Sequence, residues 1–225
     1  MYEDGYLPPI LTVDSVVFRI VRNELEVLLI KRSRKPFSGS FALPGAYNFS
    51  GETTRQALMR TLEQKAGLKA SDIALVEQLY TFDTVARDPR GHAVSVTYTC
   101  LGREKTLEPR ETSENPQFFA VDNLPSLAYD HQDIIDYALT RLRHKITYTN
   151  AMYALLPHDF TFLELQTAYE AILGKTLDKR NFRKKFMSLE LIKETGEMRR
   201  DGPHRPAKLY SFKQNKLVTL HANFD

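Results

Sequence analysis

The spacing of apolar residues changes near residue 146, and this change limits the chain to two parts of different architecture. Before that point, five short segments rich in Val, Ile and Leu and bounded by turn residues are typical of strands: 10–18, 25–30, 74–82, 93–101 and 117–121. Residues 52–67 and 131–145 carry apolar side chains at helical spacing. Strands mixed with two helices predict an α/β sandwich over residues 1–146.

The pattern after residue 146 is mostly helical. Residues 151–156 form a short apolar segment that ends at Pro157, and a second helix is expected from Thr161 to Gly174. A third helix is expected from its capping residue Asp178 to about residue 189. Two strands, 191–195 and 208–212, and the loop between them complete the outline of a winged helix-turn-helix domain over residues 147–225.

The third of these helices has one apolar face and one cationic face. Phe182, Phe186 and Leu189 recur at positions i, i+4 and i+7, whereas Arg180, Arg183 and Lys184 share another face. Arginine can bind guanine edges in the major groove, and lysine neutralises phosphate. The residues expected to contact DNA are Lys179, Arg180, Asn181, Arg183 and Lys184 of this helix, with Arg199, Arg200, His204 and Arg205 of the following loop.

The charge of the chain agrees with a polyanionic partner. Ten basic and four acidic residues lie between Lys179 and Lys208, although the net charge of the whole chain is only +3. The alternative is a solvated cationic surface that binds nothing. A third possibility is an adaptor that contacts other proteins through this basic domain.

Composition excludes several other classes of protein. The single cysteine, Cys100, allows neither an intrachain disulfide nor a cysteine-rich metal site. No apolar stretch approaches the ~18 residues of a membrane span, and residues 1–10 lack the features of a signal peptide. We therefore expect a cytoplasmic protein without membrane partners.

Residues 43–68 resemble the signature sequence of the Nudix family, the Nudix box. Glu52 matches the first glutamate of the box, Arg60 its arginine, Leu62 a hydrophobic position and Gly67 its late glycine, without a gap in the spacing. The resemblance implies a Nudix α/β/α sandwich, so that the whole chain has an α+β fold. Residues 87–92, Arg-Asp-Pro-Arg-Gly-His, are similar to a run found in Nudix proteins that handle ADP-ribose; without the family they describe a hairpin turn with an Asp–Arg pair.

The sequence departs from the box where catalytic Nudix proteins bind metal. The three later glutamates of the box fall on Thr61, Gln64 and Lys65, and the first glycine falls on Ala46. Hard divalent cations such as Mg²⁺ require oxygen ligands, usually carboxylates. We therefore expect a domain that is not an enzyme, has no catalytic residues, and requires no metal or cofactor. We further hypothesise that Lys65 neutralises a bound pyrophosphate in place of a metal ion; the alternative is an ordinary surface lysine.

The whole chain is similar to Nudix-related transcriptional regulators of the NrtR type, and the segments that carry this resemblance include 124–131, 155–157, 178–186 and 205–210. That family implies a homodimer that binds an inverted-repeat operator and represses genes of NAD or sugar metabolism until a nucleotide effector such as ADP-ribose binds. The residues expected to bind the effector are Arg32, Glu52, Arg60, Lys65, Arg87, Asp88, Arg90 and His92. The alternative function is a Mg²⁺-dependent pyrophosphatase acting on ADP-ribose or a related dinucleotide.

Overall fold

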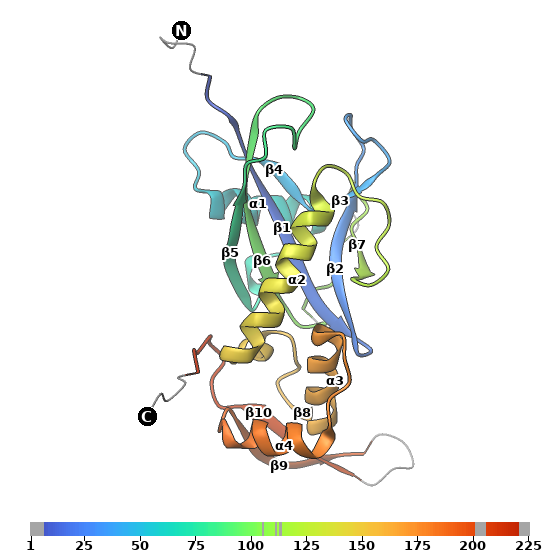
Figure 1. The fold of residues 1–225 in the computed structure, drawn as a ribbon, viewed down its shortest axis with the longest axis vertical. Coiled ribbons are helices and arrows are strands. Elements are labelled where there is room, and N and C mark those ends of the chain that lie inside the picture. The colour runs from blue at the N-terminus through green and yellow to red at the C-terminus, as the bar shows by residue number, and fades with distance from the viewer. Residues whose placement is uncertain (1–6, 105, 111, 113, 201–205, 221–225) are drawn as a thin grey trace.

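The computed structural model describes residues 7–104, 106–110, 112, 114–200 and 206–220. The chain forms an elongated molecule in which a sheet flanked by helices lies above a smaller, mainly helical part (Figure 1). This is the expected α+β arrangement. Among the described residues, no helix is long and apolar enough to cross a membrane.

A mixed seven-stranded sheet forms the larger part. Its strands are β1 (Ile10–Val21), β2 (Glu24–Lys31), β3 (Phe41–Ala42), β4 (Gly45–Tyr47), β5 (Leu75–Phe82), β6 (Ala93–Leu101) and β7 (Gln117–Ala120). The order β3-β2-β1-β6-β5 forms the main path, with β4 added to β1 and β7 to β2. β1 and β6 are parallel, whereas the other pairs are antiparallel. The five expected strands are present; β3 and β4 lie in a stretch expected to be a loop, because Pro44 and short pairing leave no periodic signal.

The first two strands form the expected hairpin. Its turn residues, Arg22 and Asn23, both have positive φ angles of 49° and 66°. Two such residues between strands match the twist of a two-residue hairpin turn, and Asn is among the few residues that adopt this conformation readily. The turn fixes the register of Val21 opposite Glu24.

One helix covers each face of this sheet: α1 (Thr54–Ala66) and α2 (His131–Tyr148). Side chains of a strand alternate between faces. Val17 and Leu28 therefore pack with Leu58 and Leu62 of α1, while neighbouring strand residues pack against α2. The result is the expected α/β/α sandwich.

Helix α1 begins two residues later than the sequence pattern indicated. The side chain of Thr53 accepts a hydrogen bond from the amide of Gln56, whose side chain accepts one from the Thr53 amide. This capping box fixes the start at Thr54 and leaves Glu52 in the preceding turn. Gly67 ends the helix with a φ of 67°, as its position in the sequence indicated.

The smaller part contains α3 (Phe162–Leu173), α4 (Lys179–Ser188) and a three-stranded sheet of order β8-β10-β9. β9 (Ile192–Arg199) is longer than expected, and β8 (Phe160–Thr161) was not expected; β10 (Ala207–Phe212) lies between them. The first expected helix is only a 3₁₀ turn, η3 (Ala151–Ala154), because the segment is short and Pro157 disfavours helical conformation in the residue before it. The remaining short 3₁₀ element is η2 (Ala70–Asp72).

The two parts are joined by a continuous hydrophobic core. A single cluster of buried residues extends from Phe18 in β1 through Ile146 in α2 to Leu165 in α3. The expected boundary between residues 146 and 147 falls within α2, which continues to Tyr148. The side chain of Arg143 also donates a hydrogen bond of 2.8 Å to the carbonyl of Ile172. The side chains of the two parts therefore pack against one another in one core.

Candidate effector cavity and nucleic-acid interface

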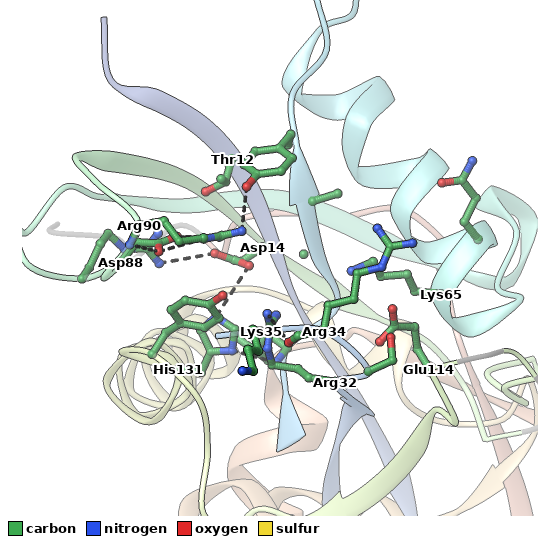
Figure 2. Close-up of a pocket in the computed structure, with 18 of the residues that line it drawn as sticks. Thr12, Asp14, Arg32, Arg34, Lys35, Lys65, Asp88, Arg90, Glu114 and His131 are labelled. Carbon is green, nitrogen blue, oxygen red and sulfur yellow. Dashed lines mark hydrogen bonds and ion pairs between the residues drawn. The ribbon is translucent and has the colours of Figure 1, made fainter. Parts of the chain in front are cut away.

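A polar cavity of about 540 Å³ opens on one side of the sheet (Figure 2). This volume lies within the ~300–1,000 Å³ typical of small-molecule sites. Seven of its lining residues are Lys or Arg and three are Asp or Glu, so the cavity is suited to an anionic ligand. The charged lining residues are Arg32, Arg34, Lys35, Arg60, Lys65, Arg87, Arg90, Asp14, Asp88 and Glu114.

A buried ion-pair network forms the floor of the cavity. Arg87 donates two hydrogen bonds of 2.8 Å to the carboxylate of Asp130 and one of 3.4 Å to Asp14. Asp14 also accepts a 2.6 Å hydrogen bond from Ser95. A Cβ atom on Gly45 would lie 1.9 Å from an oxygen of Asp14, so only glycine permits this close approach. Arg87 therefore has a structural role in addition to its place in the lining.

His131 is the first residue of α2 and lies behind the same network. Its Nδ1 atom accepts a 2.9 Å hydrogen bond from the amide of Leu43, which places the proton of the neutral ring on Nε2. Nε2 lies 3.7 Å from Asp14. Burial lowers the pKa of His131 despite the neighbouring carboxylates. This histidine therefore packs, as a neutral ring, at the start of a helix.

Aromatic side chains and arginines surround the mouth of the cavity. Arg90 binds Asp88 through paired hydrogen bonds and donates another, of 2.6 Å, to the hydroxyl of Tyr47. Burial tends to raise the pKa of Asp88, but the hydrogen bonds from Arg90 outweigh it and hold the pKa below its usual value. The guanidinium carbons of Arg60 and Arg32 lie 4.1 Å and 4.8 Å from the ring centres of Phe49 and Tyr129, respectively. Such exposed rings and planar cations can stack against a flat heterocycle.

Six of the eight residues expected to bind an effector line this cavity: Arg32, Arg60, Lys65, Arg87, Asp88 and Arg90. The other two do not. His92 is exposed directly before β6, where its carbonyl accepts a hydrogen bond from the amide of Ile10. The carboxylate of Glu52 is bound by Arg60 at 2.5 Å and 3.0 Å and by the amide of Phe49 at 2.6 Å. The hydrogen bond from Arg60 lowers the pKa of Glu52.

The residues at the later box positions do not share one surface. Thr61 is fully buried, and its hydroxyl donates to the carbonyl of Ala57 at 2.7 Å. Gln64 and Lys65 line the cavity. Burial lowers the pKa of Lys65, and the nearby Arg32 acts in the same direction against the opposing effect of Glu114. The cavity therefore receives an amide and an ammonium group from α1, but no hydroxyl from Thr61.

Helix α4 presents the cationic surface expected for nucleic-acid binding. Asp178 caps the helix by accepting a hydrogen bond from the Asn181 amide, while Phe186 is buried against α3. The exposed residues on this helix include the five expected to contact DNA, which are Lys179, Arg180, Asn181, Arg183 and Lys184. In Figure 1 the helix lies at the outer end of the smaller part, away from the large sheet.

Two of the expected DNA-contacting residues, Arg183 and Arg199, are bound by other side chains of the domain. The guanidinium group of Arg183 donates to the hydroxyl of Tyr210 at 2.9 Å and lies over the ring of Phe162. Arg199 belongs to β9 rather than to a loop and forms an ion pair with Glu164 of α3. Arg200 is exposed beyond the end of β9. His204 and Arg205 lie outside the described residues.

Family models match both parts of the chain. The model described as the NUDIX domain matches residues 11–140, and the one described as the NrtR DNA-binding winged helix domain matches residues 152–212. The ADPR responsive transcriptional repressor NtrR of Acinetobacter baylyi is 36% identical over 217 residues, which cover 93% of this chain and 84% of that protein. This chain belongs to the NrtR family of Nudix-related transcriptional regulators.

Solved NrtR structures have the same fold. The NrtR of Shewanella oneidensis complexed with a 27mer DNA has a TM-score of 0.79 at 33% identity, covering 90% of this chain and 93% of that one. Its NUDIX domain complexed with ADP ribose has a TM-score of 0.52 at 29% identity, covering 63% and 94% of the two chains. An ADP-ribose pyrophosphatase of Methanocaldococcus jannaschii is 38% identical over 136 residues, covering 59% of this chain and 75% of that protein.

Several cavity residues of this NrtR family member were not expected from its sequence. Tyr47 ends the short strand β4, Tyr129 lies in a turn, and Glu114 lies in a stretch of irregular structure. Asp14 could have been found, because it is the one charged residue within the apolar segment 10–18. A lone buried carboxylate in such a strand requires partners, which here are Ser95 and Arg87.

Proposed function

We propose that this protein is a transcriptional repressor that binds operator DNA through its winged helix domain and is released by ADP-ribose or a similar nucleotide. The observation that carries the proposal is the presence, in one chain, of a basic cavity of about 540 Å³ and a separate exposed cationic helix. The names of its relatives add support: one is an ADPR responsive repressor, and another has been crystallised with DNA.

For the DNA interface we propose the exposed residues of α4 and the adjoining end of β9. The apolar face of α4 packs against α3, so the opposite face of α4 is available to enter a major groove. The residues proposed are Lys179, Arg180, Asn181, Arg183, Lys184, Arg199 and Arg200, together with His204 and Arg205, which lie outside the described residues. We further propose a homodimer on an inverted repeat, since two equivalent winged helices match two half-sites.

For the effector site we propose the basic cavity of the Nudix domain, with no cofactor required. Arginine forms paired hydrogen bonds with phosphate oxygens, and the aromatic rings at the mouth offer stacking surfaces for an adenine. The proposed residues are Arg32, Arg60, Lys65, Arg87, Asp88 and Arg90. Support comes from the Shewanella oneidensis NUDIX domain, which was crystallised with ADP ribose. The regulated genes proposed are those of NAD-related or sugar metabolism.

The proposal is tested by fluorescence anisotropy with DNA from upstream of the gene that encodes this protein. Sequence-dependent binding that ADP-ribose weakens would support both the repressor and its effector. Binding to that DNA that is unaffected by ADP-ribose would support a regulator with a different effector, such as a sugar. Binding that is equally weak for unrelated DNA and is abolished by salt would contradict the DNA-binding proposal and favour an adaptor that contacts proteins.

A second candidate function is hydrolysis of ADP-ribose, which the similarity to the Methanocaldococcus jannaschii pyrophosphatase favours. Against it, Glu52 is bound to Arg60, and Thr61 is buried at a position where the Nudix box has a glutamate. Incubation of the protein with ADP-ribose and Mg²⁺, followed by chromatography of the products, tests this alternative. Turnover that disappears in a Glu52→Gln variant would establish an enzyme.

A further inference from the structure

The residues of the Nudix box do not fit the divalent cation that catalytic members of the family bind. Thr61 faces the hydrophobic core, and both carboxylate oxygens of Glu52 already accept hydrogen bonds from Arg60. Gln64 contributes only a neutral amide. Among the described residues, no cluster of three or more His, Cys, Asp or Glu side chains is arranged to hold a metal ion.

The carboxylates elsewhere in the cavity do not replace this set. Asp14 accepts hydrogen bonds from Ser95 and Arg87, and Asp88 is bound by Arg90. Glu114 is the remaining acidic lining residue. A single carboxylate surrounded by seven basic side chains is a poor ligand set for Mg²⁺, which requires several oxygen ligands and is repelled by the neighbouring positive charges.

Lys65 is the cationic side chain that α1 supplies at this position. It is half-buried in the cavity wall, and its ammonium group makes no hydrogen bond or ion pair with the residues that the structure describes. In Figure 2, Lys65 extends from α1 toward the part of the cavity that Arg34 also approaches, with Asp88 and Arg90 on the opposite side. Glu114 attracts this ammonium without forming an ion pair, so a bound anion would supply the hydrogen bonds that the half-buried group lacks.

We propose that the ammonium group of Lys65 replaces the divalent cation of catalytic relatives and binds the pyrophosphate of ADP-ribose without any metal. This inference rests on the proposed effector site and adds its chemistry: the charge that neutralises the phosphates is a fixed part of the protein. Burial is the main cause of the lowered pKa of Lys65, and Arg32 and Arg34 act in the same direction, so a bound anion would stabilise the charged form of the side chain. Effector sensing would then be independent of the Mg²⁺ concentration.

The test is isothermal titration calorimetry of the full chain with ADP-ribose, in excess Mg²⁺ and in EDTA. We expect the wild-type dissociation constant to agree within about twofold between the two buffers, because no metal is bound. Lys65→Met keeps the apolar stem and removes the charge. We expect it to weaken binding roughly 10- to 100-fold in both buffers, the range expected for one hydrogen bond to a charged group.

The matched control is Arg55→Gln, which removes one positive charge from the same helix. Arg55 is exposed and does not line the cavity, so the Arg55→Gln variant should bind ADP-ribose with wild-type affinity. Circular dichroism melting of both variants without ligand checks that they fold. Lys65→Met should melt at the wild-type temperature or higher, because it removes an unpaired, half-buried charge.

Two results would overturn the inference while leaving the effector proposal intact. One is ADP-ribose binding that is lost in EDTA and restored by Mg²⁺; the other is wild-type affinity of Lys65→Met. If ADP-ribose does not bind at all, the effector proposal fails, and inorganic pyrophosphate is titrated in EDTA instead. Pyrophosphate binding that Lys65→Met weakens would still support the metal-free site. If pyrophosphate does not bind, or binds equally well to Lys65→Met, the metal-free site is overturned as well.

Discussion

Asn23 Oδ1 accepts a 2.9 Å hydrogen bond from the hydroxyl of Thr167, which lies 144 residues further along the chain. The contact places the tip of the first hairpin on α3 of the winged helix domain. The same hairpin contributes Thr12 and Asp14 to the cavity from β1, while Arg32 follows directly after β2. A paired two-stranded ribbon therefore connects the candidate effector cavity with the DNA-binding domain.

We predict that this contact couples effector binding to DNA binding. Asn23→Gly keeps a residue that favours a positive φ but removes the side chain that bonds Thr167. Measured by anisotropy, the change in DNA affinity caused by ADP-ribose should decrease by about two- to fivefold, a fraction of a typical coupling of 1–3 kcal/mol. Thr167→Ala should have the same effect, and the double variant should add nothing further. Unchanged coupling in both single variants would contradict the prediction.

Arg87 is predicted to stabilise the fold more than any cavity-lining residue of similar charge. Arg87→Met leaves Asp130 and the buried Asp14 without their cationic partner, which should cost about 3–5 kcal/mol of unfolding free energy. Urea denaturation followed by circular dichroism measures the loss. The control is Arg34→Met: this exposed side chain lines the same cavity, and its removal should change stability by less than about 0.5 kcal/mol. Equal effects of the two substitutions would show that the buried network contributes little.

Protonation of His131 is predicted to destabilise the folded protein below about pH 6.5, the usual pKa of an unfolded histidine. Burial lowers its pKa in the folded state, so the unfolded chain binds a proton that the folded chain does not. The contribution of His131 to the free energy of unfolding is therefore fully present above about pH 6.5. As the pH decreases below that value, this free energy falls by at most about 1.4 kcal/mol per pH unit. His131→Asn retains an acceptor for the Leu43 amide and cannot titrate. Its denaturation curves at pH 7.5 and about 5.5 should differ less than those of the wild type.

The cationic face of α4 is predicted to set the salt dependence of DNA binding. If Arg180 and Lys184 each contact one phosphate, substitution of either by alanine should weaken binding to all sequences and reduce the slope of log affinity against log salt concentration by about 1. Arg55→Gln in the Nudix domain removes an equal charge elsewhere and should leave the slope unchanged. If both α4 variants retain the wild-type slope, DNA must bind to a different surface of the protein.

Arg183 is predicted to stabilise the winged helix domain in addition to its proposed contact with DNA. Arg183→Ala removes a hydrogen bond to Tyr210 and the contact with the ring of Phe162, which together should cost about 1–2 kcal/mol. Urea denaturation measures this loss. Arg180→Ala on the same helix removes an exposed side chain and should leave stability nearly unchanged, so similar denaturation midpoints for the two variants would contradict this role.

Local sequence signals predicted much of the fold because they act through neighbouring residues. The helix ends at Gly67 and Gly174 and the cap at Asp178 depend on backbone conformation within one turn. The two-residue strand at Phe160–Thr161 had no clear signal in the sequence. It forms only because β10 lies beside it and pairs with it. The expected start of α1 at Glu52 was two residues early, because the capping box of Thr53 and Gln56 sets the first helical residue at Thr54.

The sequence by itself determined the two-part architecture, the cationic face of α4 and the departure of residues 61, 64 and 65 from the Nudix box, because periodicity and residue type are properties of the chain alone. Only the tertiary structure decided which side chains share the cavity. It brings together Asp14, Arg87 and His131 from three separate elements, turns Thr61 into the core and leaves His92 outside. The physical reason is that long-range packing of strands and helices, rather than local conformation, fixes the distances between charged groups.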